Sequence, residues 1–320
     1  MKLNKVTEEI LKEITDWNGI FDGAYSLRED GECVSYQNSD HIRIVKKSDK
    51  PGIDIYISNA AKDETVYIPA CVTKSKVNDL VYNDFHLQEG ARVTIVAGCG
   101  VHTDSDEASG HSGVHRFFLE KNSHCVYKEK HIGIGEGAGK RSIDPVTEIE
   151  LFEGAYLEME TIQLRGVDTS VRKTSAVLHN DAKLIIHESL LTDAGETATT
   201  DFVVDMLGDD SSVDIVSRSV AKGDSYQEYT SKINGRARCT GHSECDAILV
   251  DNGKVNASPA LFAANLDAAL IHEAAIGKIA GEQIIKLETL GLSEEEAQNR
   301  IIAGFLGSKE TLKAEVKSKP

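Results

Sequence analysis

Three residues in the C-terminal quarter of this chain carry side chains that could bind a metal ion together. They are Cys245 and the adjacent pair His272 and Glu273, which offer a thiol, an imidazole and a carboxylate. Such a set suits iron and gives a more labile site than four cysteines. Plainer interpretations stay open: Cys245 as a buried core thiol, and Glu273 as a first-turn helix acid stabilised by the helix dipole.

A second group of metal-ligand side chains lies within residues 99–131. Its members are Cys99, His102, His111, His115, His124, Cys125 and His131. No spacing among them matches a known ligand motif. A fold that stacks distant segments could still assemble a zinc or iron site from them, so a metal site and ordinary surface histidines both remain open.

The glycine-rich run 133–141 looks like a phosphate-binding loop. A Walker A motif, however, needs glycine where Ile134 stands and serine or threonine where Arg141 stands. The dinucleotide-binding spacing fails at Ala138, and no helix follows before Pro145. We therefore expect a flexible turn here and no ATPase activity from this chain.

The elements that must position these residues are mostly strands. Residues 42–250 form short alternating runs broken by Gly, Asn and Asp. A unit of one turn residue, one small residue and a strand recurs about every 27 to 32 residues, beginning at Gly90, Asn122, Gly154, Asp181 and Asp210. One unit cannot close its own hydrophobic face, so the repeat predicts a parallel β-helix with one coil per unit.

Helices are expected on both sides of the repeats. Apolar spacing predicts an amphipathic helix over 6–17 and another starting at Glu273 and ending near Gly291. Ser293 and Glu296 form a capping box that starts a further helix at Glu294, with Ala297, Ile301, Ile302 and Phe305 on its buried face. We expect these terminal helices to cover the two open ends of the β-helix.

The predicted organisation has three parts: an N-terminal helical segment (1–40), a β-helix core (41–256) and a C-terminal helical subdomain (257–320). The net charge of −17 argues against binding to nucleic acid or an anionic membrane. There is no apolar run of about 18 residues, and residues 1–16 lack a signal-peptide core. The six cysteines contain no CxxC pair. We expect a soluble, cytoplasmic protein.

Several short blocks in the last 75 or so residues resemble, in the right order, the C-terminal core of the SufB/SufD family of iron–sulfur cluster assembly proteins. They are 245–250, 257–259, 272–279, 282–283 and 291–297. The resemblance implies a right-handed parallel β-helix flanked by helices, in a homodimer or a heterodimer with a paralogue. It also implies a SufC-like ABC ATPase partner and a cysteine desulfurase or other sulfur donor. The short chain is similar to compact archaeal and anaerobic-bacterial members.

The resemblance also implies roles for individual residues. Cys245 matches the family's scaffold cysteine, and the His272-Glu273 pair follows the SufB pattern, whereas SufD-like members keep only the histidine. The three would hold a nascent iron–sulfur cluster. Cys99 matches a cysteine on a proposed sulfur path, but His131-Ile132-Gly133 stands where the SufB pattern has Gln-Asn-Trp, which puts a relay through Cys99 in doubt.

The leading hypothesis is a non-catalytic scaffold that holds the cluster at a dimer interface. An ATPase would dock on the C-terminal helices through Glu282, Gln283, Leu292, Glu296, Ile301 and Phe305. One alternative is an iron- or zinc-binding or regulatory protein that uses residues 99–131. Another is a β-helix carbohydrate-active enzyme, which the single Trp and 6% aromatic content disfavour because such enzymes present aromatic platforms to sugars.

Overall fold

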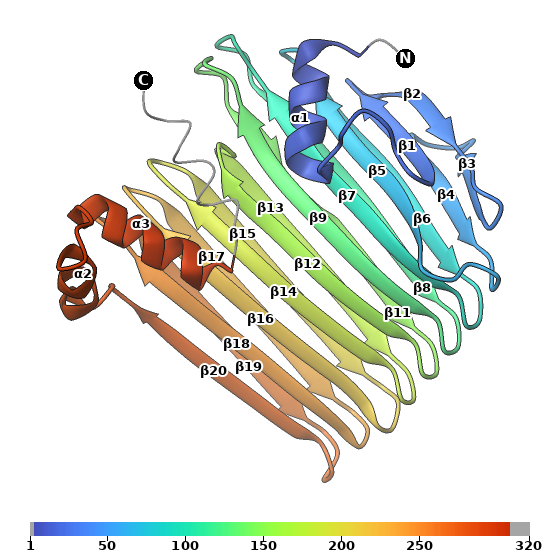
Figure 1. Ribbon diagram of the computed structural model, residues 1–320. Helices are drawn as coiled ribbons and strands as arrows, with labels where there is room; N and C mark the ends of the chain where they lie inside the picture. The colour runs from blue at the N-terminus through green and yellow to red at the C-terminus, as the bar shows by residue number, and fades with distance from the viewer. Residues whose placement is uncertain (1–2, 308–320) are drawn as a thin grey trace.

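The computed structural model describes residues 3–307 and shows a β-solenoid built from two sheets that lie face to face (Figure 1). In its sheet order, the first sheet consists of β2 (Glu32–Gln37), β1 (Ala24–Glu29), β5 (Glu64–Val72), β7 (Arg92–His102), β9 (His124–Ile134), β12 (Tyr156–Arg165), β14 (Lys183–Thr192), β16 (Ser211–Ala221), β18 (Cys239–Leu249) and β20 (Ala269–Gly277).

The second sheet faces the first and is supplied by the intervening strands. They are β19 (Lys254–Ala263), β17 (Tyr226–Gly235), β15 (Thr197–Met206), β13 (Thr169–Leu178), β10 (Arg141–Ile143), β11 (Val146–Leu151), β8 (Ser109–Leu119), β6 (Asn78–Leu87), β4 (Gly52–Ile57) and β3 (Ile42–Lys46). The chain alternates between the sheets, so each coil adds one parallel strand to both. The predicted parallel β-helix is confirmed.

The repeated turn residues have a conformational cause. Gly90, Asn122, Gly154, Asp181 and Asp210 all have φ between 55° and 70°. Glycine adopts this left-handed region freely, and Asn and Asp tolerate it better than other residues. The small residue that follows each turn is fully buried, as Ala91 and Ala155 illustrate. The predicted units therefore mark the corners at which the chain enters the first sheet.

The N-terminal end of the solenoid is closed by antiparallel pairs. β1 pairs antiparallel with β2, and β3 with β4, while every later pairing is parallel. Strands thus begin at Ala24, inside the segment 1–40 that was expected to be helical. This part of the expectation is wrong, because residues 24–29 form a strand of the first sheet that lies between β2 and β5.

The terminal helices lie on a sheet face and do not cover the solenoid ends (Figure 1). α1 (Lys5–Thr15) packs Ile10 and Ile14 against Cys71 on β5 and Ile132 on β9. α3 (Glu294–Phe305) packs Ile302 against Val220 and Val250 near the other end of the same sheet. The prediction that the helices close the ends is wrong, because α1 and α3 bury their apolar residues on the outer face of the first sheet.

The helix expected from Glu273 begins later. Ala269–Gly277 is β20, and α2 spans only Gly281–Glu288. Asp267-Ala268 repeats the turn residue and small residue that open the earlier units, so this segment forms one more coil. The other predictions about this region are confirmed: Gly291 has a φ of 94°, and Ser293 and Glu296 form a capping box at the start of α3.

No helix in residues 3–307 is long and apolar enough to cross a membrane.

The glycines around Cys99 make room for α1. Cys99 faces the lumen between the sheets, while Gly98 and Gly100 face outward beneath the helix. A Cβ on Gly100 would lie 2.5 Å from Cγ2 of Ile10. The Gly98-Cys99-Gly100 run thus has a packing cause that is separate from any role of the thiol.

We predict that Gly100→Ala lowers the free energy of unfolding by about 1 to 3 kcal/mol, the usual cost of overpacking, because the new methyl group displaces α1. Equilibrium unfolding in urea measures the change. Gly195→Ala is the matched control, since a Cβ there meets nothing within 4 Å. Equal stability of the two variants would contradict the packing of α1 on this sheet.

Candidate functional site

His272 and Glu273 lie on opposite faces of the first sheet. Both belong to β20, and neighbouring residues of a strand point to opposite sides. His272 pairs in register with the inward-facing Ser243 of β18, and Glu273 pairs with the outward-facing Glu244. The predicted dyad therefore does not converge on one metal ion within a single chain.

His272 is an imidazole without a partner inside the solenoid. Both of its ring nitrogens are shielded from solvent, and neither has a hydrogen-bond partner among residues 3–307. Ser243, its neighbour in register, is already engaged by Ser231 at 3.0 Å and Tyr229 at 3.2 Å. A buried polar group left unsatisfied costs about 1 to 3 kcal/mol. An unpartnered ring at this depth is suited to accept a ligand.

Cys245 faces the same lumen on the adjacent strand. It pairs with Ala274, two residues along β20 from His272, so the Cα atoms of Cys245 and His272 are about 8 Å apart by standard strand geometry. Its side chain is buried, and burial, followed by the charges of Glu188 and Asp246, raises the pKa of the thiol to about 12. The thiol is protonated at neutral pH and needs a metal to displace its proton.

A row of polar side chains leads through the lumen to Cys245. In-register pairing of five strands places its members side by side, in the order Glu129, Thr161, Glu188, Ser217 and Cys245. All five are buried. We call this set the polar row. It connects the middle of the solenoid to the last coils.

Arg172 from the opposite sheet neutralises the polar row. Its Nη1 donates to Glu129 at 2.7 Å, and its Nε lies 3.6 Å from Glu188. Glu188 in turn accepts hydrogen bonds from Ser217 at 2.7 Å and Thr200 at 3.0 Å. Burial opposes ionisation of Glu129, but His131 and Arg172 outweigh it and hold the pKa of this carboxyl well below its ordinary value. Because burial also lowers the pKa of His131, Arg172 supplies the countercharge at neutral pH.

Cys99 opens on a cavity of about 770 Å³ at the N-terminal end of the polar row. The cavity is also lined by His111, His115, Glu129 and His131. Burial, followed by the charge of Glu129, raises the pKa of Cys99 well above its ordinary value. Beyond Glu129 the lumen narrows to a cavity of about 10 Å³, which has room for about one water molecule.

Three other predicted ligands of the 99–131 segment, His102, His124 and Cys125, do not line this cavity. Cys125 belongs to the hydrophobic core, His102 lies 3.2 Å from Asp104, and His124 stacks on Tyr156. The inward histidines already have partners: His111 bonds Asp79 at 3.0 Å, and His115 contacts Tyr127 at 3.3 Å. None of the segment's residues belongs to a group of three metal-donor atoms within 4.8 Å in the described part of the chain.

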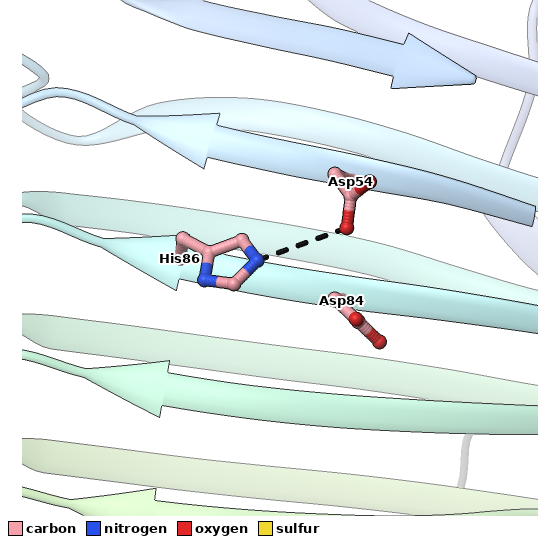
Figure 2. A group of neighbouring side chains, drawn as sticks. All are labelled: Asp54, Asp84 and His86. Carbon is pink, nitrogen blue, oxygen red and sulfur yellow. Dashed lines mark ion pairs between the residues drawn. The ribbon is translucent and has the colours of Figure 1, made fainter. Parts of the chain in front are cut away.

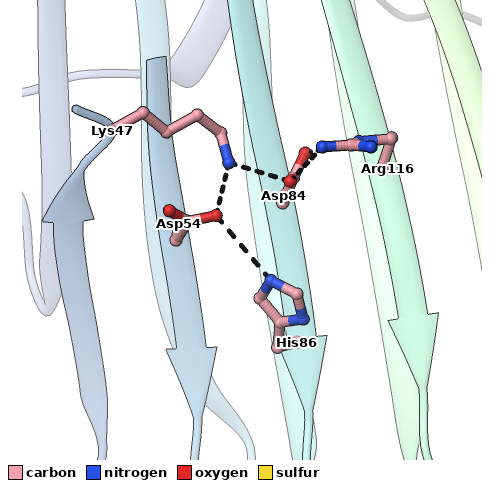
Figure 3. A network of polar contacts seen from close by, with 5 residues as sticks. All are labelled: Lys47, Asp54, Asp84, His86 and Arg116. Carbon is pink, nitrogen blue, oxygen red and sulfur yellow. Dashed lines mark hydrogen bonds and ion pairs between the residues drawn. The ribbon is translucent and has the colours of Figure 1, made fainter. Parts of the chain in front are cut away.

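One group of donors that does come together is Asp54, Asp84 and His86 on the outer face of the second sheet (Figure 2). Lys47 bridges Asp54 and Asp84, and Arg116 forms two hydrogen bonds to Asp84 (Figure 3). Burial opposes ionisation of Asp84, but Arg116 and Lys47 prevail and lower its pKa. The two basic side chains occupy the positions that a metal ion would take, so this group is an ion-pair network.

The predicted docking residues lie on and around the C-terminal helices. Glu282, Gln283 and Glu296 are exposed, and Leu292, Ile301 and Phe305 are half-buried. Glu296 also accepts from the backbone N–H of Ser293 at 2.9 Å, so part of its role is to cap α3.

The glycine-rich run 133–141 makes backbone hydrogen bonds to residues 103–107; the Gly137 N–H, for example, donates to the carbonyl of Thr103. The run leads into the strand β10. It is not the start of a phosphate-binding helix.

A family model described as "SUF system FeS cluster assembly, SufBD core domain" matches residues 77–305. The chain belongs to the SufBD family. An iron–sulfur cluster assembly SufBD family protein of Archaeoglobus fulgidus is 28% identical over 83% of this chain and 72% of its own length. A second from Methanothermobacter thermautotrophicus (strain Delta H) is 30% identical over 76% of this chain, and this chain spans 59% of it.

A third SufBD protein, from Pyrococcus horikoshii, is 41% identical over 92 residues, which are 28% of this chain and 21% of that protein. The family resemblance seen in the sequence is therefore confirmed. The protein is an iron–sulfur cluster assembly protein of the SufBD family.

The sequence reasoning missed the charged members of this SufBD protein's lumen. Glu129, Arg172 and Glu188 had no motif to mark them. The strand pattern did mark Glu129. It is two and four residues from the apolar Tyr127 and Cys125, so all three side chains point to the same, inward side of the strand. A charged residue at an inward position of a buried strand indicates a paired internal charge.

We predict that this SufBD protein loses stability as the pH falls from about 6.5 to about 4. Burial lowers the pKa of His115 to about 4, so over this range the unfolded chain takes up a proton that the folded chain does not, at about 1.4 kcal/mol per pH unit. His115→Asn should flatten the slope, measured by urea unfolding at several pH values. His124→Asn, on the outer face, should keep the wild-type slope. Identical slopes for all three proteins would refute the buried, neutral state of His115.

Proposed function

We propose that this protein is a scaffold on which an iron–sulfur cluster is assembled, with Cys245 and His272 as ligands inside the last coils of the solenoid. The observation that carries the proposal is the pairing of a buried thiol with an unpartnered imidazole on adjacent strands, both facing the lumen. Iron in biological clusters accepts thiolate and imidazole ligands. Two protein ligands hold a cluster less firmly than four, which suits a cluster that must leave.

Glu273 was predicted to complete the ligand set. Within one chain it faces away from the lumen, so the proposal assigns the remaining coordination positions to sulfide or to a second chain. The cluster is the cargo of the protein, and the protein itself is proposed to be non-catalytic.

A second chain of the same fold is proposed to cover the C-terminal end of the solenoid. β19 and β20 end their sheets with one edge unpaired. Two inward-facing apolar residues of this last coil are exposed, Leu261 at 39% and Ile276 at 41%. Unpaired strand edges and apolar surface of this kind favour association. Cys245 lies only one strand from this edge, which supports a cluster near a dimer interface formed by two copies or by a paralogue.

An ABC ATPase is proposed to dock on the C-terminal helices. α2 has no buried residue among those described, and Ile285 is 60% exposed and Leu290 76%. α3 fastens these helices to the solenoid through Ile302 and through Leu306, whose carbonyl accepts from Ser189 at 3.1 Å. Movement of α3 would reach the strands that carry Ser217 and Cys245, which gives such a partner a route to the site.

Cys99 is proposed as a sulfur relay. Its cavity could receive sulfur from a donor such as a cysteine desulfurase, and the polar row runs from that cavity to Cys245. The packed lumen between Cys99 and Cys245 means that Arg172 would have to move for sulfur to pass. The departure of His131-Ile132-Gly133 from the SufB pattern falls in this same region.

The scaffold proposal predicts that Cys245→Ser abolishes anaerobic reconstitution of a cluster from ferrous iron and sulfide, because serine lacks the soft sulfur ligand. The visible charge-transfer absorbance of the reconstituted protein measures cluster content. Cys33→Ser, at an exposed thiol on β2, is the control and should reconstitute like the wild type. Wild-type absorbance in the Cys245→Ser variant would rule out Cys245 as a cluster ligand.

The dimer proposal predicts that Leu261→Glu converts the protein to monomer, since a carboxylate would be buried in the interface. Sedimentation velocity reports the oligomeric state, and circular dichroism confirms that the variant folds. Leu80→Glu, at an exposed leucine on the outward side of β6, should leave the dimer intact. A wild-type monomer, or a dimer that survives Leu261→Glu, rejects the open end as the interface.

A further inference from the structure

A group of three metal-donor side chains lies on the outer face of the first sheet, behind the wall that carries Cys245. His242 and Glu244 are two residues apart on β18, and Glu273 stands beside Glu244 on β20. One donor atom from each lies within 4.8 Å of the others. Donors around a bound transition metal are about 3 to 3.5 Å apart, so small side-chain rotations would close the set.

His242 is oriented by a carboxylate outside this group. Its Nδ1 lies 2.8 Å from Oδ1 of Asp214, its register neighbour on β16. A carboxylate can only accept, so Nδ1 carries a proton, and in the neutral ring Nε2 is the nitrogen that keeps a lone pair. A histidine held by a carboxylate in this way is the usual arrangement for a metal ligand, because the hydrogen bond fixes the tautomer and raises the basicity of the free nitrogen.

The charges around the group are not balanced. Arg218 is the basic side chain that approaches it, and its Nη2 lies 3.8 Å from Glu244. No ion-pair partner approaches Glu273 in residues 3–307. The contrast with Asp54, Asp84 and His86 decides the interpretation, because there Lys47 and Arg116 already neutralise the carboxylates. No basic side chain lies between the donors of His242, Glu244 and Glu273 in the described residues, so a metal ion could take that place.

We propose that His242, Glu244 and Glu273 form a binding site for a divalent transition-metal ion on the outer face of the solenoid. One imidazole and two carboxylates match the preferences of ferrous iron and its neighbours in the first row, and leave coordination positions for water. The identification of the ion as ferrous iron rests on the proposed function; the site itself does not. It gives Glu273 a role that is distinct from that of His272, with a metal ion on one side of the sheet and a cluster on the other.

The test is anaerobic equilibrium dialysis of the full-length protein against ferrous iron without sulfide. We expect one tightly held ion per chain, with His242→Ala and Glu244→Gln each weakening binding at least about tenfold. Asp214→Ala, which leaves the three ligands in place, should cost about tenfold or more. His179→Ala is the matched control: His179 lies 3.3 Å from Glu150 on the outer side of the other sheet, with no third donor.

A second variant separates this proposal from the scaffold function. Cys245→Ser should lose the reconstituted cluster and keep the ferrous ion, because the thiol faces the opposite side of the sheet. Binding that survives His242→Ala, or that is lost in Cys245→Ser, overturns the outer site. Circular dichroism of each variant checks that loss of binding is not loss of folding, and the absorption of bound Co²⁺ in the wild type, absent from His242→Ala, gives an independent readout.

Discussion

In-register parallel stacking is the constraint on which the rest of this molecule depends. Each coil places its residues directly beside those of the coil before, about 4.8 Å away. Residues about 30 positions apart in the chain therefore become neighbours, and the polar row from Glu129 to Cys245 is one register line across five strands. The same stacking aligns the small buried residues at the corners of successive coils. The distances between side chains at any site in the lumen are therefore set by the spacing of the coils.

Strand alternation divides chemistry between the two sides of the wall. His272 and Glu273 are adjacent in sequence and yet face different environments: the lumen for the imidazole and the outer face for the carboxylate. Cys245 and Glu244 are separated in the same way. A pair of adjacent polar residues suggests one site when it is placed on a helix, whereas on a strand it suggests two. Whether His272 and Glu273 are interpreted as one site or as two therefore depends on whether residues 269–277 form a helix or a strand.

The sequence allowed the solenoid to be predicted because its corners require left-handed turn residues at regular intervals, and Gly, Asn and Asp mark them. It did not reveal the last coil, because Asp267-Ala268 was followed by apolar residues whose spacing also fits a helix. Cys245, the proposed scaffold thiol, was found through family resemblance. Arg172, which neutralises Glu129 and Glu188, could not be found, since nothing local shows which distant strand an isolated arginine will face.

Burying the charged side chains of the lumen costs desolvation free energy, so their presence needs an explanation other than stability. Replacing a buried ion pair by apolar residues is often neutral or stabilising, so stability alone does not account for the buried charges of Glu129, Arg172 and Glu188. They lie between the cavity beside Cys99 and the thiol at Cys245. A solenoid that needed only rigidity could fill this row with valine, as parallel strands usually do. A polar row that ends at Cys245, the proposed cluster ligand, is consistent with the proposed sulfur relay from Cys99.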